Sequence, residues 1–190
     1  MGNKLVFGSI FVVCFFLSTF FYVSSINAGS KVNKFEVLKV GKTMPNALLQ
    51  RFGHSNIEIK DLMGKVKIIS IVPKLNTPVC DKQTHQFSEQ NGGLDKQVDI
   101  ITISTNSTEG QNTFAKKAKI NNLIFLSDKT ELSFGRNTGL LIEEMGMLAR
   151  TVLVLDEKNT IRYVDFVPGG GLPDIKGALA AAKKVLLKES

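Results

Sequence analysis

The feature that most constrains the fold is a set of β-branched apolar runs of strand length. Three of them, at residues 66–72, 99–104 and 151–156, are nearly continuous in apolar residues. Such runs are typical of strands that are buried on both faces of a sheet. A fourth run, at residues 160–166, follows the turn sequence DEKN. The sequence therefore predicts a central sheet that is covered on both sides.

Helix-like segments alternate with these strands. Residues 80–90, 108–118 and 173–189 combine helical composition with apolar spacing. This alternation predicts an α/β fold with a mixed central sheet flanked by helices. Residues 168–174, PGGGLPD, are predicted to form a flexible loop that leads into the last helix. No Lys-Ser or Lys-Thr pair follows the glycines, so we interpret the loop as structural rather than as a phosphate-binding loop.

Composition limits the classes of function. With 190 residues and 43% apolar content, the chain fits one globular domain whose core needs no disulfide or metal framework. The net charge of +7 comes from scattered Lys and Arg residues, with no basic run interleaved with aromatic residues. This pattern favours a solvated basic surface over a nucleic-acid interface. The two histidines, His54 and His85, lie far apart in sequence, which argues against a zinc site, and no motif indicates a cofactor.

The N-terminal segment differs from the rest of the chain. Residues 1–28 carry one charge, Lys4, followed by an apolar run at residues 5–23 and a small polar stretch that ends at Ala28. This pattern predicts an export signal peptide, with a retained N-terminal membrane anchor as the second reading. Both readings place the domain of residues 31–190 outside the cytoplasm, in a periplasmic or other extracytoplasmic location.

The chain has two cysteines, too few for a disulfide framework. Cys14 lies inside the apolar run and is preceded by Val12 and Val13, where a lipoprotein would need small residues. We therefore interpret Cys14 as an apolar residue of the export segment. Cys80 is then the only cysteine of the predicted domain.

Cys80 lies in the stretch SIVPKLNTPVCDKQTHQF, residues 70–87. This stretch leaves a buried strand, turns between Pro73 and Pro78, and is predicted to enter a helix near Cys80. Free backbone N–H groups and the helix dipole at such a position stabilise an anion, which favours the nucleophilic thiolate. Position 77 is Thr77, so the Cys-x-x-Cys pair of disulfide oxidoreductases is absent. A free cysteine is also often a small buried apolar residue, and placement alone leaves both readings open.

The pattern Pro73-x-x-x-Thr77-x-x-Cys80 resembles the active-site motif of peroxiredoxins. The chain is most similar to the thiol peroxidase subfamily, whose order and spacing are matched by residues 64–87, 103–123 and 147–159. The resemblance covers residues 35–190. It implies a thioredoxin-like fold and the thiol-dependent reduction of hydrogen peroxide and organic hydroperoxides.

The resemblance assigns roles to four residues. Cys80 would attack a peroxide oxygen as thiolate and become a sulfenic acid. Thr77 would direct its hydroxyl at the thiolate and the peroxide, and Arg150 would stabilise the charge on sulfur and on the departing oxygen. Pro73 would cover the thiol. The alternatives are a helix cap for Thr77, a turn residue for Pro73 and a surface cation for Arg150.

The chain departs from the thiol peroxidase pattern at one position. Ala115, after Phe114, stands where the subfamily usually carries its resolving cysteine. The resemblance therefore implies a one-cysteine cycle, in which an external thiol reductant, either a thioredoxin-like protein or a small thiol, reduces Cys80. It also implies a homodimer.

Two other readings compete with a peroxidase. The first is an exported thioredoxin-fold redox sensor or thiol-transfer protein without peroxidase turnover, which the missing resolving cysteine favours. The second is a non-enzymatic binding or chaperone module that kept the fold and does not need Cys80.

Overall fold

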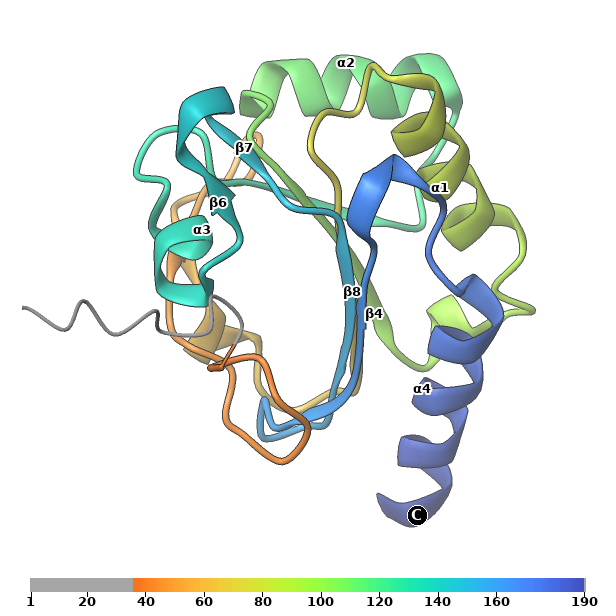
Figure 1. The fold of residues 1–190 in the computed structure, drawn as a ribbon. Coiled ribbons are helices and arrows are strands. Elements are labelled where there is room, and N and C mark those ends of the chain that lie inside the picture. The colour runs from red at the N-terminus through yellow and green to blue at the C-terminus, as the bar shows by residue number, and fades with distance from the viewer. Residues whose placement is uncertain (1–35, 190) are drawn as a thin grey trace, which may run out of the picture. The chain divides into compact units, whose positions relative to one another are not determined.

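The structure is a computed structural model that describes residues 36–189. A five-stranded mixed sheet forms its centre (Figure 1). Its strand order is β5-β4-β3-β8-β9. The strands β3, β4 and β5 are parallel to one another, whereas β8 is antiparallel to both β3 and β9. The strands are β3 (Lys67–Ile71), β4 (Asp99–Ser104), β5 (Ile124–Ser127), β8 (Thr151–Leu155) and β9 (Ile161–Phe166). The mixed sheet and four of its five strands confirm the sequence prediction.

Three long helices correspond to the three predicted helical segments. Helix α1 (Pro78–Glu89) begins two residues earlier than predicted, because Pro78 occupies its first position and its fixed φ suits a helix start. Helix α2 (Thr108–Ala118) has the predicted bounds, and the Ser107 hydroxyl caps it by accepting from the Gly110 N–H at 3.2 Å. Helix α4 (Ile175–Glu189) follows a loop that contains the short 3-10 turn η4 (Pro168–Gly170).

The sequence patterns did not predict the shorter elements. These are strand β5, helix α3 (Ser133–Thr138), and two small antiparallel sheets. The small sheets pair β1 (Leu48–Leu49) with β2 (Ile57–Glu58) and β6 (Leu141–Ile142) with β7 (Met147–Leu148). The 3-10 turns η1 (Ile59–Leu62), η2 (Leu94–Lys96) and η3 (Glu143–Met145) complete the set. Elements of two residues are fixed by their partners rather than by a local periodicity, so no run of residues indicates them.

The sheet has a hydrophobic core on each face. Helices α1 and α4 cover one face, and α3 with the small sheets covers the other (Figure 1). Burial of each large aliphatic side chain contributes on the order of 1.5–3 kcal/mol. The α1 and α4 face is built from Ile68, Ile100, Val152, Val154, Phe87, Ala178, Leu179 and Ala182. The opposite face is built from Ile69, Ile71, Ile101, Ile103, Leu153, Leu155, Phe134 and Leu140.

Strand β8 places Arg150 at the end of the sheet where β3 finishes and the β3–α1 loop begins. Thr151 pairs with Ile71, the last residue of β3, and Arg150 directly precedes this pair. The Arg150 carbonyl accepts a hydrogen bond from the Val167 N–H at 3.1 Å. Sheet pairing thus fixes the backbone of Arg150 before its side chain makes any contact.

The turn between β8 and β9 holds this hairpin together at its other end. The Asp156 carboxylate accepts from the backbone N–H of Thr160 at 2.7 Å and of Lys158 at 3.0 Å, and it pairs with Arg162. Burial acts to raise the pKa of Asp156, but these hydrogen bonds and Arg162 outweigh it and lower the pKa. The carboxylate therefore serves as a charged clamp on the turn.

The predicted export segment, residues 1–28, lies outside the described residues. Within residues 36–189, every helix is too short or too polar to cross a lipid bilayer.

Candidate active site

The loop between β3 and α1 is anchored on the neighbouring strand and its following loop. The Val72 N–H donates to the Ile103 carbonyl at 3.0 Å, which extends the β3–β4 pairing by one residue. The buried Leu75 donates its N–H to the Asn106 side chain at 3.0 Å. These contacts fix the path of the chain into α1 and thereby the position of Cys80.

Cys80 is the third residue of α1, and its side chain is only 1% exposed. It packs in a small apolar cluster with Val72, Leu75, Phe114 and Phe125. An apolar environment disfavours a charged sulfur, whereas the helix start favours it. The balance between these effects is decided by the polar groups that reach the sulfur.

Arg150 is the polar group that reaches it. Its Nη2 donates to Cys80 Sγ at 3.2 Å, and the residue is only 7% exposed. The guanidinium stays charged at any physiological pH, so it presents a fixed positive charge to the thiol. Its Nε is buried and has no hydrogen-bond partner among the described residues. That N–H is an unpaired buried donor on the residue whose Nη2 contacts the sulfur.

Gln83 is a site residue that sequence reasoning missed. It is fully buried in α1, its Oε1 accepts from Arg150 Nη1, and its Nε2 donates to the Ser70 hydroxyl at 2.8 Å. Gln83 therefore holds the guanidinium between α1 and β3. Its spacing could have indicated a position beside the thiol, because residues three apart share one helix face and Gln83 follows Cys80 by three.

Thr77 and Pro73 lie on the loop that leads to Cys80. Thr77 is an exposed N-cap residue whose hydroxyl donates to the Lys74 carbonyl at 3.0 Å and makes no capping bond to the helix. Pro73 is half-buried. The structure thus joins Cys80 directly to Arg150, while contacts of Thr77 and Pro73 with the thiol stay predictions.

Ala115, the position without a resolving cysteine, is half-buried on α2. It lines a hollow of about 170 Å³ together with Phe52, His54 and Phe125. Thr113 and Lys117, on another face of the same helix, line a separate groove toward α1. A side chain at position 115 therefore faces away from α1.

The mixed sheet with a single thiol at the start of the helix after its central strand defines a thioredoxin-like redox protein. Arg150 adds a fixed positive charge in contact with the sulfur. The family model described as Redoxin matches residues 39–179, and the chain belongs to this family.

Two bacterial relatives illustrate the similarity in sequence. The chain is 36% identical over 159 residues to a thiol peroxidase of Staphylococcus epidermidis, which covers 83% of this chain and 92% of that protein. It is 40% identical over 147 residues to a thiol peroxidase of Streptococcus pneumoniae, with 77% of this chain and 90% of that protein covered.

Solved structures agree with the fold. A peroxiredoxin-like protein from Aquifex aeolicus superposes with a TM-score of 0.71 at 28% identity, covering 78% of this chain and 88% of that one. Mycobacterium tuberculosis AhpC superposes with a TM-score of 0.64 at 20% identity, covering 80% and 96%. These likenesses confirm the thioredoxin-like α/β fold predicted from the sequence.

The first prediction concerns Gln83. Gln83→Ala frees the Arg150 side chain, so we expect the rate constant for alkylation of Cys80 to fall roughly 10- to 150-fold, as for loss of one buried hydrogen bond to a charged group. Gln83→Glu should lower it further, because the new carboxylate competes with the sulfur for the guanidinium charge. Rapid-mixing alkylation with a neutral reagent measures both variants.

The matched control is Gln90→Ala, which removes an exposed amide just beyond the other end of α1. It should alkylate at the wild-type rate. Wild-type reactivity in a well-folded Gln83→Ala protein would show that Gln83 does not position Arg150.

Proposed function

We propose that this protein is a thiol peroxidase that reduces hydrogen peroxide and organic hydroperoxides through Cys80. The observation that carries the proposal is the 3.2 Å contact between Arg150 Nη2 and the buried Cys80 sulfur. The Redoxin family and the two thiol peroxidases similar to this chain support it. The chain is thus an enzyme of the peroxiredoxin type.

The reaction begins with attack of the Cys80 thiolate on one peroxide oxygen. A sulfur–oxygen bond forms as the O–O bond breaks, and the departing oxygen takes a proton and leaves as water or an alcohol. Arg150 remains on the sulfur through Nη2, while its buried Nε lies free to bind a peroxide oxygen. Charge that develops on the oxygens therefore meets a fixed cation in a site of low polarity.

Thr77 aligns the peroxide in this proposal. Its hydroxyl proton is committed to the Lys74 carbonyl, so the lone pairs of the same oxygen are free to accept from a peroxide O–H. This hydrogen bond orients the O–O bond toward the sulfur. Pro73, half-buried on the same loop, covers the thiol and limits access of water.

The second prediction tests Thr77. Thr77→Val keeps the volume and branching but removes the hydroxyl, so the rate constant for Cys80 oxidation by hydrogen peroxide should fall on the order of 10²-fold. The melting temperature should stay near that of wild type, because Thr77 makes no capping bond to α1. Thr160→Val, at the opposite end of the sheet, is the control. A wild-type oxidation rate in Thr77→Val would exclude this role.

The catalytic cycle uses one cysteine. Cys80 is the only cysteine after residue 28, and Ala115 supplies no resolving thiol. An external thiol therefore attacks the sulfenic acid, releases water and forms a mixed disulfide, which a second thiol reduces. A redox sensor without turnover is the less favoured reading, because the two bacterial relatives described above are thiol peroxidases.

The third prediction is the test of this function. With one equivalent of hydrogen peroxide, Cys80 should form a sulfenic acid that dimedone traps, with no internal disulfide on a non-reducing gel. Added thiol should restore the reduced form and sustain peroxide consumption, and excess peroxide without thiol should give sulfinic acid. Cys80→Ser should do none of this. Oxidation without recycling by any of several thiols would favour the sensor.

Ala115→Cys gives a sharper form of this third test. The new thiol should pair with Cys80 after oxidation and protect it from sulfinic acid formation. Because position 115 faces away from α1, pairing requires the ends of α1 and α2 to unwind. Lys116→Cys, on the exposed neighbouring position, is the control and should pair much less. Peptide mapping distinguishes these outcomes.

We further propose that the protein is exported. The apolar run at residues 5–23 and the small residues up to Ala28 support a cleaved signal, with a membrane anchor as the alternative. The fourth prediction is that the protein expressed from its full sequence is recovered outside the cytoplasm with an N-terminus just after Ala28. A full-length protein in the membrane fraction would indicate the anchor, and one in the cytoplasm would contradict export.

The homodimer implied by the resemblance stays a prediction.

A further inference from the structure

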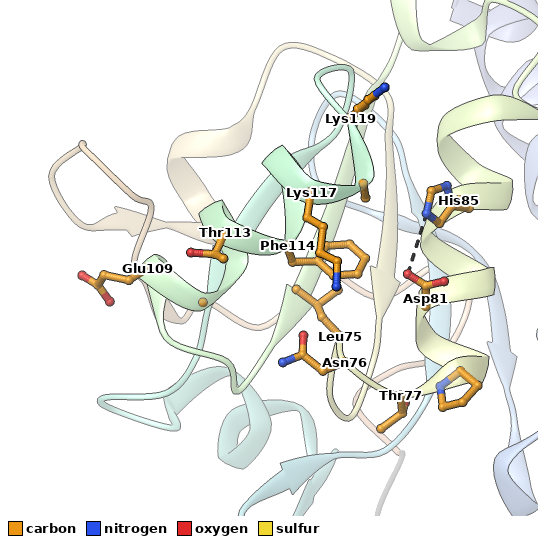
Figure 2. Close-up of a pocket in the computed structure, with 13 residues that line it drawn as sticks. Leu75, Asn76, Thr77, Asp81, His85, Glu109, Thr113, Phe114, Lys117 and Lys119 are labelled. Atoms are coloured by element: carbon orange, nitrogen blue, oxygen red, sulfur yellow. Dashed lines mark ion pairs between the residues drawn. The ribbon is translucent and has the colours of Figure 1, made fainter.

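A solvent-open groove lies between α1 and α2 (Figure 2). Its volume is about 1040 Å³. Thr77, Pro78 and Asp81, which flank Cys80 in the sequence, line its α1 side. The reaction proposed above uses Thr77 at one end of this groove and leaves the rest of it without a role.

The floor of the groove is shared with the cysteine. Phe114 and Leu75 line the groove on one side and pack in the cluster that contains Cys80. Phe114 also packs edge-on against Phe125, with ring centroids 6.2 Å apart. One layer of apolar side chains therefore separates the groove from the sulfur.

The two walls of the groove carry opposite charges. On α1, the His85 ring lies between the carboxylates of Asp81, at 3.7 Å, and Glu89, at 2.8 Å. On α2, Lys117 extends over Leu75 and Phe114 (Figure 2). Within residues 36–189 no ion pair engages Lys117, so its charge is open to a ligand.

One acidic residue interrupts the basic wall. Glu109 lies at the far edge of the groove, and its carboxylate points away from the floor (Figure 2). Its own backbone N–H and the neighbouring Thr108 hydroxyl lower the pKa of this carboxyl, as expected at a helix start. Glu109 is therefore engaged with its own helix end.

We propose that this groove binds the external reductant, a peptide-sized thiol that carries both an ammonium group and carboxylates. The proposal rests on the one-cysteine cycle proposed above and names the partner of that cycle. A carboxylate of the thiol would meet Lys117, its ammonium group would meet Asp81, and its middle would lie on Phe114. The groove is at the upper end of the size range of small-molecule sites, about 300–1,000 Å³.

The thiol reaches the sulfur where the floor of the groove meets the start of α1. The Thr77 side chain makes no capping bond to the first turn of α1, where the Asp81 N–H donates to the Thr77 carbonyl at 2.9 Å. Opening of the turn turns Cys80 toward the groove. The bound thiolate then attacks the sulfenic sulfur, the S–O bond breaks, and the hydroxyl leaves as water with one proton. A second thiol attacks the mixed disulfide, which releases reduced Cys80 and the oxidised disulfide of the small thiol.

The fifth prediction compares two reductants on oxidised Cys80, glutathione and the uncharged 2-mercaptoethanol. Lys117→Glu should slow reduction by glutathione roughly 5- to 30-fold, because an attractive contact becomes a repulsive one. Reduction by 2-mercaptoethanol should change less than twofold. Lys184→Glu, an exposed charge reversal on α4, is the control and should leave both rates near wild type. Rapid mixing follows each step separately.

The outcomes separate this proposal from the peroxidase proposal. Oxidation of Cys80 by peroxide is measured first and depends only on the proposed function. Equal slowing of both reductants by Lys117→Glu, or reduction of wild type by a thioredoxin-like protein but not by glutathione, would overturn the groove proposal alone. If peroxide does not oxidise Cys80, binding of the unreactive S-methylglutathione, followed by NMR, still tests the groove. Loss of that binding in Lys117→Glu supports the proposal, and no binding to wild type overturns it.

Discussion

The hydrogen bond from Arg150 to the Cys80 sulfur is the interaction on which the site depends. The thiol is 1% exposed among apolar side chains, and the guanidinium at 3.2 Å is the charged group that reaches it. The bond forms because Cys80 follows β3 and Arg150 precedes β8, and these strands pair with each other. The sheet therefore sets the distance between the two groups. Removal of either partner would leave the other buried without its counterpart.

Local patterns predicted the parts of the fold that local forces determine. The runs that became β3, β4 and β8 are buried on nearly all sides, so their composition alone indicated strands. Strand β5 has two half-buried residues, and α3 spans six residues between residues of left-handed conformation, so neither has a periodicity long enough to recognise. Their positions follow from pairing with segments distant in sequence.

The site residues likewise fall into those that local sequence indicates and those that only the folded structure brings together. The helix start and its thiol could be predicted from the turn between Pro73 and Pro78, but the partner of the thiol could not. Arg150 was assigned by resemblance alone, because 70 residues separate it from Cys80. Gln83 was missed because its role exists only through Ser70, 13 residues away, and Arg150, 67 residues away. A polar residue on the inner face of a helix indicates a buried contact without naming the partner.

The alanine at position 115 changes what governs the lifetime of the oxidised protein. Helix α2 is capped by Ser107 and carries at this position the residue that favours helices most, so no step in recycling Cys80 requires it to come apart. Peroxide and thiol then compete from solution for the same sulfenic sulfur. The fraction of molecules that survives each oxidation then follows the ratio of the two concentrations outside the protein, because no internal disulfide forms through an unfolded α2. The peroxide concentration at which the protein is irreversibly inactivated is therefore set by the concentration of thiol around it.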